Sequence, residues 1–186
     1  RKIGPAKVFL RERDAVRAIK GQGDKQVVPG DIIVLICGGP LGTGMEETYQ
    51  VTSALKHLSW GREVAVITDA RFSGVSTGAC IGHVGPEALA GGPIGKVRDG
   101  DMIEIIVDRN NLVGSVNLIG ENNVAVDWQT GASILAARGM RTDLQAHPNL
   151  PDDTRLWAAL QHVSGGTWGG CVYDADSIIA RLTNPQ

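Results

Sequence analysis

The sequence predicts an α/β protein whose sheets carry their helices on one side. Apolar runs of strand length are interleaved with amphipathic segments of helical period, but without the strict alternation of a parallel βαβ fold. Hydrophobic residues make up 42% of the 186 residues and charged residues 20%, an ordinary balance for a globular chain with one core. We therefore expect one domain, with a core over about 4–140 and a C-terminal extension over about 141–186.

The first half of the chain is predicted to contain two helices and two buried strands. Residues 14–20 place apolar side chains on one face of a short helix. Continuous apolar runs over 31–37 and 63–68 are typical of strands buried on both faces. A glycine-rich loop follows the first strand, and an amphipathic helix is expected over 46–58. The polar segment 69–78 is expected to form a loop.

The second half is predicted to contain a hairpin, an irregular segment and further helices. The hairpin is indicated by two β-rich runs that flank an Asp-Arg-Asn-Asn sequence. The expected elements are a helical turn with proline at its first position over 86–89, a hairpin of 102–107 with 112–117, an irregular segment over 139–153, and helices over 154–163 and 177–182. Three tryptophans, Trp128, Trp157 and Trp168, are interpreted as packing residues.

Composition excludes several classes of function. A formal net charge of −2 argues against binding to nucleic acid or to an anionic membrane, and no apolar run is long enough to cross a bilayer. The three cysteines, Cys37, Cys80 and Cys171, are odd in number and widely spaced, which favours a reducing, cytoplasmic compartment. Since none forms a C-x-x-C pair, we interpret most of them as small buried side chains, and the thiolates of any metal cluster are expected elsewhere.

A cluster of glycines at 38–44 is the first candidate site, because it links a strand to a helix as phosphate-binding loops do. Neither standard template fits. A P-loop needs Lys after Gly44, where Met45 stands, and a dinucleotide fingerprint needs glycine at Glu47. Two interpretations remain for Glu46 and Glu47. They cap the helix, which the residues alone favour, or they bind a hard cation such as Mg²⁺.

The second candidate site is the loop after the strand at 63–68, which contains Arg71, Ser73 and several other hydroxyls. Ligands of open α/β sheets bind at the carboxyl ends of strands. Ser73 has no adjacent histidine and no G-x-S-x-G frame, so it would need a metal or an oriented partner to react. Residue chemistry alone therefore favours a turn serine. His83, in a third glycine-rich loop, is interpreted as a structural hydrogen-bond donor.

Taken together, these segments resemble the dihydroxy-acid and sugar-acid (phosphogluconate) dehydratase family. The matching motifs, in order, are Gly44-Met45-x-Glu47, Thr68-Asp69-x-Arg71-Phe72-Ser73-Gly74, Gly82-His83-Val84-x-Pro86-Glu87-Ala88, Gly91-Gly92-Pro93-Ile94 and Val97-x-Asp99-Gly100-Asp101-x-Ile103. They cover residues about 4–120. Two later segments, 150–157 and 164–168, resemble the bacterial D-xylonate (pentonate) dehydratases in particular.

The resemblance implies a fold and a chemistry. The fold would be a C-terminal swivelling β/β/α domain with a barrel-like β core, as in aconitase-type enzymes. It would follow an N-terminal domain that supplies the cysteines of an iron–sulfur cluster and most Mg²⁺ ligands. The enzyme would be a homo-oligomeric hydro-lyase that converts a 2,3-dihydroxy sugar acid to the 2-keto-3-deoxy acid. Ser73 would be the catalytic base and Glu47 an Mg²⁺ ligand, while Arg71, Ser76 and Thr77 would contact substrate.

Two further hypotheses compete with an enzyme domain. The chain could be a stand-alone small subunit or ligand-binding module that docks on a separate large chain. This hypothesis is motivated by the resemblance to swivelling domains and by the start at Arg1. It could also be a structural or oligomerisation domain, but that leaves its polar glycine loops unexplained. A parent reading frame that continues several hundred residues upstream of Arg1 would favour the enzyme domain.

Overall fold

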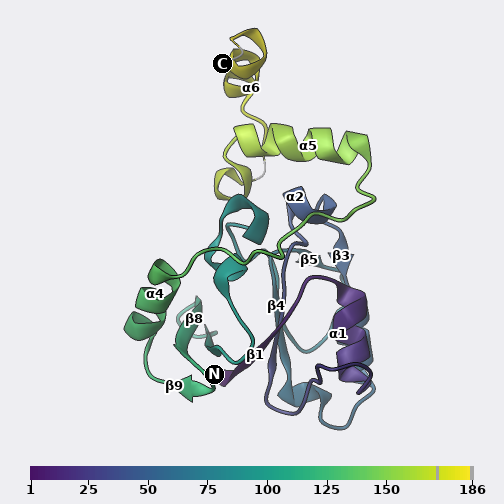
Figure 1. Ribbon diagram of the computed structural model, residues 1–186, viewed down its shortest axis with the longest axis vertical. Helices are drawn as coiled ribbons and strands as arrows, with labels where there is room; N and C mark the ends of the chain where they lie inside the picture. Colours follow the sequence, from purple (N-terminus) through teal and green to yellow (C-terminus); the bar gives the residue numbers. More distant parts are fainter. Residues whose placement is uncertain (171, 185–186) are drawn as a thin grey trace.

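A seven-stranded mixed sheet forms the centre of the molecule (Figure 1). The computed structural model describes residues 1–170 and 172–184. The strands are β1 (Lys2–Phe9), β2 (Ile32–Leu35), β4 (Ala65–Thr68), β6 (Ala79–Ile81), β7 (Met102–Asp108), β8 (Val113–Glu121) and β9 (Val124–Ala125), in the order β6-β4-β2-β1-β7-β8-β9. The first four strands in this order are parallel, and β7, β8 and β9 continue the sheet antiparallel.

Apolar side chains from both faces of the sheet form two cores, as expected for strands buried on both sides. In β2, Ile33 and Leu35 belong to one core, whereas Ile32 and Val34 belong to the other. The first core is covered by helices α1 (Glu12–Ile19) and α3 (Gln50–Lys56), which pack on each other. The second is covered by short 3₁₀ turns η2 (Ala88–Ala90) and η3 (Pro93–Lys96) and by helix α4 (Trp128–Ala137).

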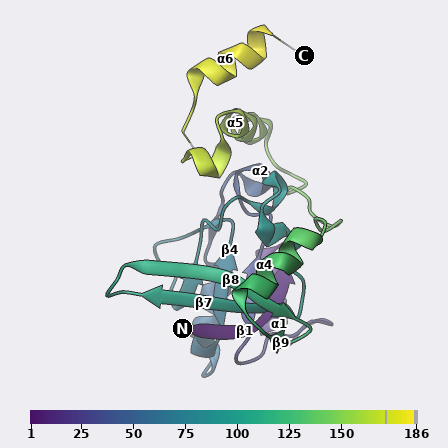
Figure 2. The ribbon, with the colours of Figure 1, turned by 90° about the vertical axis from the view of Figure 1, so that its left-hand side faces the viewer.

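Most of the remaining elements lie at the carboxyl ends of the parallel strands. Strands β3 (Glu47–Thr48) and β5 (Arg71–Phe72) form a small parallel pair there, beside helix α2 (Pro40–Thr43), whereas turn η1 (Gly61–Glu63) precedes β4 at the opposite end. The C-terminal extension contains α5 (Asp152–Val163), η4 (Gly166–Gly169) and α6 (Ala175–Thr183). Helix α5 lies over α2, and α6 projects farther from the sheet (Figures 1 and 2).

The α/β class is confirmed, but the helices do not all lie on one side. Helix α4, which the sequence analysis missed, lies across the sheet from α1 (Figure 1). Over the described residues, the sheet is open between its edge strands β6 and β9. The hairpin, the irregular segment and the two C-terminal helices are confirmed. The strands β1 and β6 were also not predicted.

Several local expectations were wrong. The helix expected over 46–58 begins only at Gln50, so the glutamates before it do not cap it. The Glu12 carboxylate does so instead, because it accepts hydrogen bonds from the amides of Tyr49 (2.9 Å) and Val51 (3.0 Å). The turn expected at 86–89 begins at Ala88, after a cis Gly85–Pro86 peptide bond, so proline is not its first residue.

Side chains assigned to packing are only partly buried. Trp128 and Trp168 are 56% and 78% exposed, so their assignment as packing residues was wrong, whereas Trp157 is half-buried. Cys37 is buried and Cys80 half-buried, and Cys171 lies outside the described residues. No helix within the described ranges is long and apolar enough to cross a bilayer.

Candidate functional site

The buried carboxylate of Asp69 joins three loops at the carboxyl ends of β2 and β4. It accepts hydrogen bonds from the backbone amides of Cys37 (3.1 Å), Gly38 (2.9 Å) and Ala88 (2.9 Å). Its side chain is 2% exposed, and burial raises its pKa, while the three amides act in the opposite direction. Asp69 therefore fixes the glycine-rich loop, its own loop and the start of η2 relative to one another.

Glu47 and Arg71 meet across the small parallel pair of strands. They are directly opposite in the β3–β5 register, and the guanidinium donates to the Glu47 carboxylate at 2.6 Å. Arg71 Nε also donates to the carbonyl of Met45 at 2.8 Å. Both side chains are nearly half exposed. This carboxylate–guanidinium pair faces solvent at the end of the sheet, where a ligand can reach it.

Ser73 lies directly beyond this pair. Its backbone amide donates to the Thr48 carbonyl at 3.2 Å, which extends the β3–β5 pairing by one residue. Side chains alternate along a strand, so Arg71 and Ser73 are expected on the same side of it. Within the described part of the chain, the Ser73 hydroxyl forms no hydrogen bond. A half-buried hydroxyl that holds no structural contact is free to interact with a ligand.

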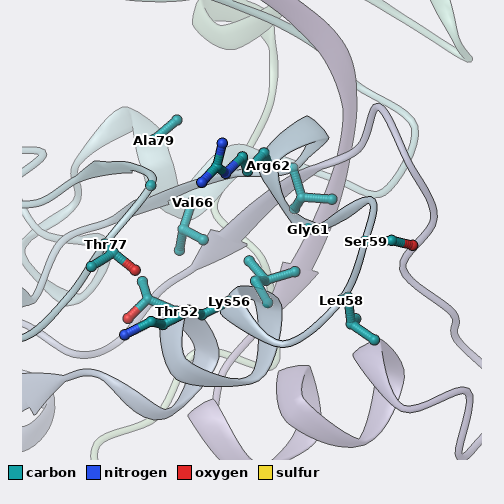
Figure 3. Close-up of a pocket in the computed structure, with 12 residues that line it drawn as sticks. Thr52, Lys56, Leu58, Ser59, Gly61, Arg62, Val66, Thr77 and Ala79 are labelled. Atoms are coloured by element: carbon teal, nitrogen blue, oxygen red, sulfur yellow. The ribbon is translucent and has the colours of Figure 1, made fainter.

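Ser76 and Thr77 are placed differently. The Ser76 hydroxyl donates to the Thr48 carbonyl at 3.1 Å, so it stabilises the loop. Thr77 lines a cavity of about 310 Å³ with Thr52, Lys56 and Arg62 on the side of the sheet that α3 covers (Figure 3). Glu47 lines a separate cavity, of about 70 Å³, with Cys37, Gly38 and Ala70 among others. The structure thus brings Glu47, Arg71 and Ser73 together but not Thr77, and the roles of all five residues stay predictions.

The described residues do not fit an iron–sulfur cluster. Among them, no group of three or more His, Cys, Asp or Glu side chains is arranged to hold a metal ion. Burial raises the pKa of the Cys37 thiol to about 11, so the free thiol is protonated at neutral pH, and the pKa of Cys80 is also raised by burial. Glu47 can supply one oxygen to a hard cation such as Mg²⁺, which often takes only one or two protein carboxylates.

Glu87 is a site residue whose role the sequence analysis missed. It is 4% exposed, and its carboxylate accepts hydrogen bonds from the Leu41 amide at the start of α2 (3.0 and 3.1 Å). Burial, and secondarily the charge of Asp69, raise its pKa to about 7. A carboxylate within a run of small apolar residues was the available signal. His83 is exposed, and its imidazole forms no hydrogen bond in the described ranges. The interpretation of His83 as a structural hydrogen-bond donor was therefore wrong.

We expect Glu87 to make the protein less stable as the pH rises from about 4.5 to about 7. Its folded pKa is raised, so the folded state binds the proton more tightly than the unfolded state, and this stability is lost as the pH rises through the folded value. The contribution is at most about 3 kcal/mol. Asp69 and His162 are the titratable neighbours, and they are unchanged in Glu87→Gln.

The measurement is the denaturation midpoint of both proteins at pH 5 and pH 7.5. Glutamine keeps an oxygen for the Leu41 amide but does not titrate. The difference between the two pH values should therefore be smaller in Glu87→Gln than in the unchanged protein. Equal differences would mean that Glu87 does not titrate in this range.

Comparison with known proteins places this geometry in a family. The dihydroxy-acid/6-phosphogluconate dehydratase C-terminal profile matches residues 1–145, more than half of the chain. The chain belongs to this family. The match spans the loops that carry Glu47, Arg71, Ser73 and Glu87. The resemblance inferred from the motifs is therefore confirmed.

The relatives include two proteins of Escherichia coli (strain K12). D-xylonate dehydratase YagF is 65% identical over 176 residues, which are 95% of this chain and 26% of that protein. D-xylonate dehydratase YjhG is 60% identical over 181 residues, 96% of this chain and 27% of that protein. A dihydroxy-acid dehydratase of Lachnospira eligens is 52% identical over 103 residues, 55% of this chain and 18% of that protein. The chain thus spans about a quarter of the length of its D-xylonate dehydratase relatives.

Proposed function

We propose that this chain is the C-terminal swivelling domain of a sugar-acid dehydratase that acts on an aldonate such as D-xylonate. The observation that carries the proposal is the convergence of Glu47, Arg71 and Ser73 at the carboxyl end of the parallel strands. The names of the relatives support the substrate class. In those relatives the matched region lies in a chain about four times as long, which favours this proposal over a stand-alone small subunit.

The reaction removes water from a 2,3-dihydroxy acid. The proton on C2 passes to the Ser73 oxygen, which acts as an alkoxide. The C3–O bond breaks, and the departing hydroxide takes a proton from solvent and leaves as water, while Ser73 returns the C2 proton to solvent. The enol that remains becomes the 2-keto-3-deoxy acid. Serine needs an electropositive environment to accept a proton. The Arg71 guanidinium, two residues away on the same strand, supplies one positive charge, and it is also placed to contact the acid's carboxylate.

Glu47 is proposed to be one ligand of an Mg²⁺ ion whose other ligands lie outside this chain. When bound, this ion would hold the carboxylate and C2 oxygen of the acid. An iron–sulfur cluster would likewise depend on cysteines outside this chain. The N-terminal part of the same protein is the expected partner, in a cytoplasmic homo-oligomer. The chain's own residues would bind the acid, orient it and move the C2 proton.

The experiment is a screen of the full-length protein against purified aldonic acids, with 2-keto-3-deoxy acid formation as the readout. We expect turnover of at least one pentonate, and D-xylonate is the first candidate. Dihydroxy acids that are not aldonates serve as the comparison, because relatives named dihydroxy-acid dehydratases match little more than half of this chain. Failure with every pentonate and hexonate would overturn the proposed substrate class.

A further inference from the structure

The glycine loop that leads to Glu47 is held from outside by the C-terminal extension. Residues 38–45 contain four glycines, and such backbone loses much conformational entropy when it is fixed in one shape. Asp69 and Glu87 anchor this loop on its inner side, through the amides of Gly38 and Leu41. The Glu87 carboxylate also interacts with the backbone amide of Gly42, and these inner contacts end there.

The extension supplies contacts to the part of the loop from Gly42 onward. The amide of His147 donates to the Gly42 carbonyl at 2.8 Å, and the Arg11 guanidinium holds the Ala146 carbonyl at 3.1 Å. Helix α5 then packs on α2, with Ala158 only 3% exposed. Thr154 closes over Gly44 so tightly that a Cβ at Gly44 would overlap the Thr154 methyl group.

Gly44 is the point at which this contact reaches the site. It has a left-handed backbone (φ 71°), and it directly precedes Met45, whose carbonyl accepts the hydrogen bond from Arg71. Glu47 follows two residues later and pairs with the same guanidinium. Any movement of the loop at Gly44 therefore shifts both oxygens that Arg71 holds.

The comparisons supply an independent observation. The family match ends at residue 145, but the two D-xylonate dehydratases match 95% and 96% of the chain, so their similarity continues well into the extension. The dihydroxy-acid dehydratases are 48–52% identical to this chain, and their matches cover only 55–59% of its length. The contacts to Gly42 and Gly44 are made by the part of the chain beyond the family match.

We propose that residues 146–163, the clamp segment, position the loop that carries Glu47. Thr154 and Ala158 are positioning residues in this proposal, because they act on Glu47 through Gly44 and α2 and contact neither metal nor substrate. The clamp segment fixes a loop that its glycines would otherwise leave flexible, and it lies beyond the family match, in the part of the chain that the D-xylonate dehydratase relatives still match. Its effect on Mg²⁺ binding rests on the proposed function, whereas its effect on the loop does not.

The test compares Ala158→Glu with Ala159→Glu in the full-length protein. Both place a glutamate in the middle of α5, but Ala158 is buried near Pro40 and Leu41 of α2, whereas Ala159 is exposed. Amide hydrogen exchange of residues 41–47 should become about tenfold faster in Ala158→Glu, as for the loss of roughly one hydrogen bond from a local opening equilibrium. In Ala159→Glu it should not change. Unchanged exchange in Ala158→Glu, with α5 itself exchanging faster, would overturn the clamp.

The second readout is the Mg²⁺ concentration for half-maximal activity. We expect it to rise about tenfold in Ala158→Glu, the lower end of the effect of losing a partner that orients a metal ligand. The kcat at saturating Mg²⁺ should be retained. Faster loop exchange with an unchanged Mg²⁺ requirement would overturn the role toward Glu47. If the unmodified protein turns over no aldonate, the proposed function fails, and exchange alone decides the clamp.

A reciprocal pair keeps the proposal testable if Ala158→Glu does not fold. Gly44→Ala should accelerate exchange of the loop, because the added methyl collides with Thr154. Adding Thr154→Ser removes the opposing methyl and should reverse part of this change, although the left-handed backbone still disfavours alanine. Such a reversal measures coupling between the two positions. No reversal would show that Thr154 does not press on the loop.

Discussion

Ser73→Ala in the full-length protein is expected to lower kcat about 1,000-fold, within the range typical of a lost general base. In the proposed mechanism the alanine cannot take the C2 proton, while Arg71 remains to bind the acid and Glu47 to bind Mg²⁺, so KM should change little. The substitution should leave the fold intact, because the hydroxyl forms no hydrogen bond within the described residues and the backbone amide keeps its contact to Thr48. The measurements are steady-state kinetics with an aldonate and the visible absorption of the proposed iron–sulfur cluster.

The matched control is Ser76→Ala, three residues along the same loop. Its hydroxyl does hold a structural hydrogen bond, to the Thr48 carbonyl, so its loss should cost about 1 kcal/mol of stability. Its effect on kcat should be far smaller than that of Ser73→Ala. Equal losses of kcat would indicate that the loop's shape matters and that Ser73 is not the base. Retained turnover in Ser73→Ala would contradict the base assignment directly.

The contrast between predicted and missed elements has a physical basis. The strands β2 and β4 are buried on both faces, and such burial requires continuous apolar sequence that is visible without structure. Strand β1 is interrupted by Gly4 and Pro5, which hides its pattern. Helix α4 contains Gly131, which lies so close to β8 that a Cβ would overlap the Leu118 carbonyl. Close approach between a helix and a strand is a tertiary property that the hydrophobic periodicity of a local segment does not reveal.

The candidate site shows the same contrast between predicted and missed features. Motif order identified the loops, because reacting groups need particular residue types at fixed spacing. The position of Glu47 on a strand was not predicted, because β3 is only two residues long and forms through its pairing with β5, 24 positions later. The anchoring roles of Asp69 and Glu87 were missed because their partners are backbone amides, which every residue carries. Hydrogen bonds to backbone amides therefore cannot be predicted from the types of the partner side chains.

Asp69→Asn is expected to lower the thermal unfolding midpoint by about 5–12 °C, which corresponds to about 2–4 kcal/mol for a domain of this size. The carboxylate accepts from three backbone amides that belong to two other segments. Asparagine has one side-chain oxygen. Its NH₂ group would take the place of the second carboxylate oxygen and would face a backbone amide that is also a donor. At least one buried amide would then lose its acceptor, at a cost of about 1–3 kcal/mol.

Asp24→Asn is the matched control, since this exposed carboxylate forms no hydrogen bond or ion pair among the described residues. Its midpoint should be unchanged. Equal midpoints for the two variants would contradict the anchoring role of Asp69.

The consequence of Asp69→Asn for catalysis follows from the same contacts. Asp69 joins the loop that leads to Glu47 to the loop that carries Arg71 and Ser73. Its loss should therefore lower activity at 25 °C, below the unfolding transition, and should speed amide exchange at Cys37 and Gly38. The burial that raises the pKa of Asp69 also makes each of its amide contacts hard for water to replace. A glycine-rich site can be open to substrate and still hold its geometry because its anchors are buried carboxylates.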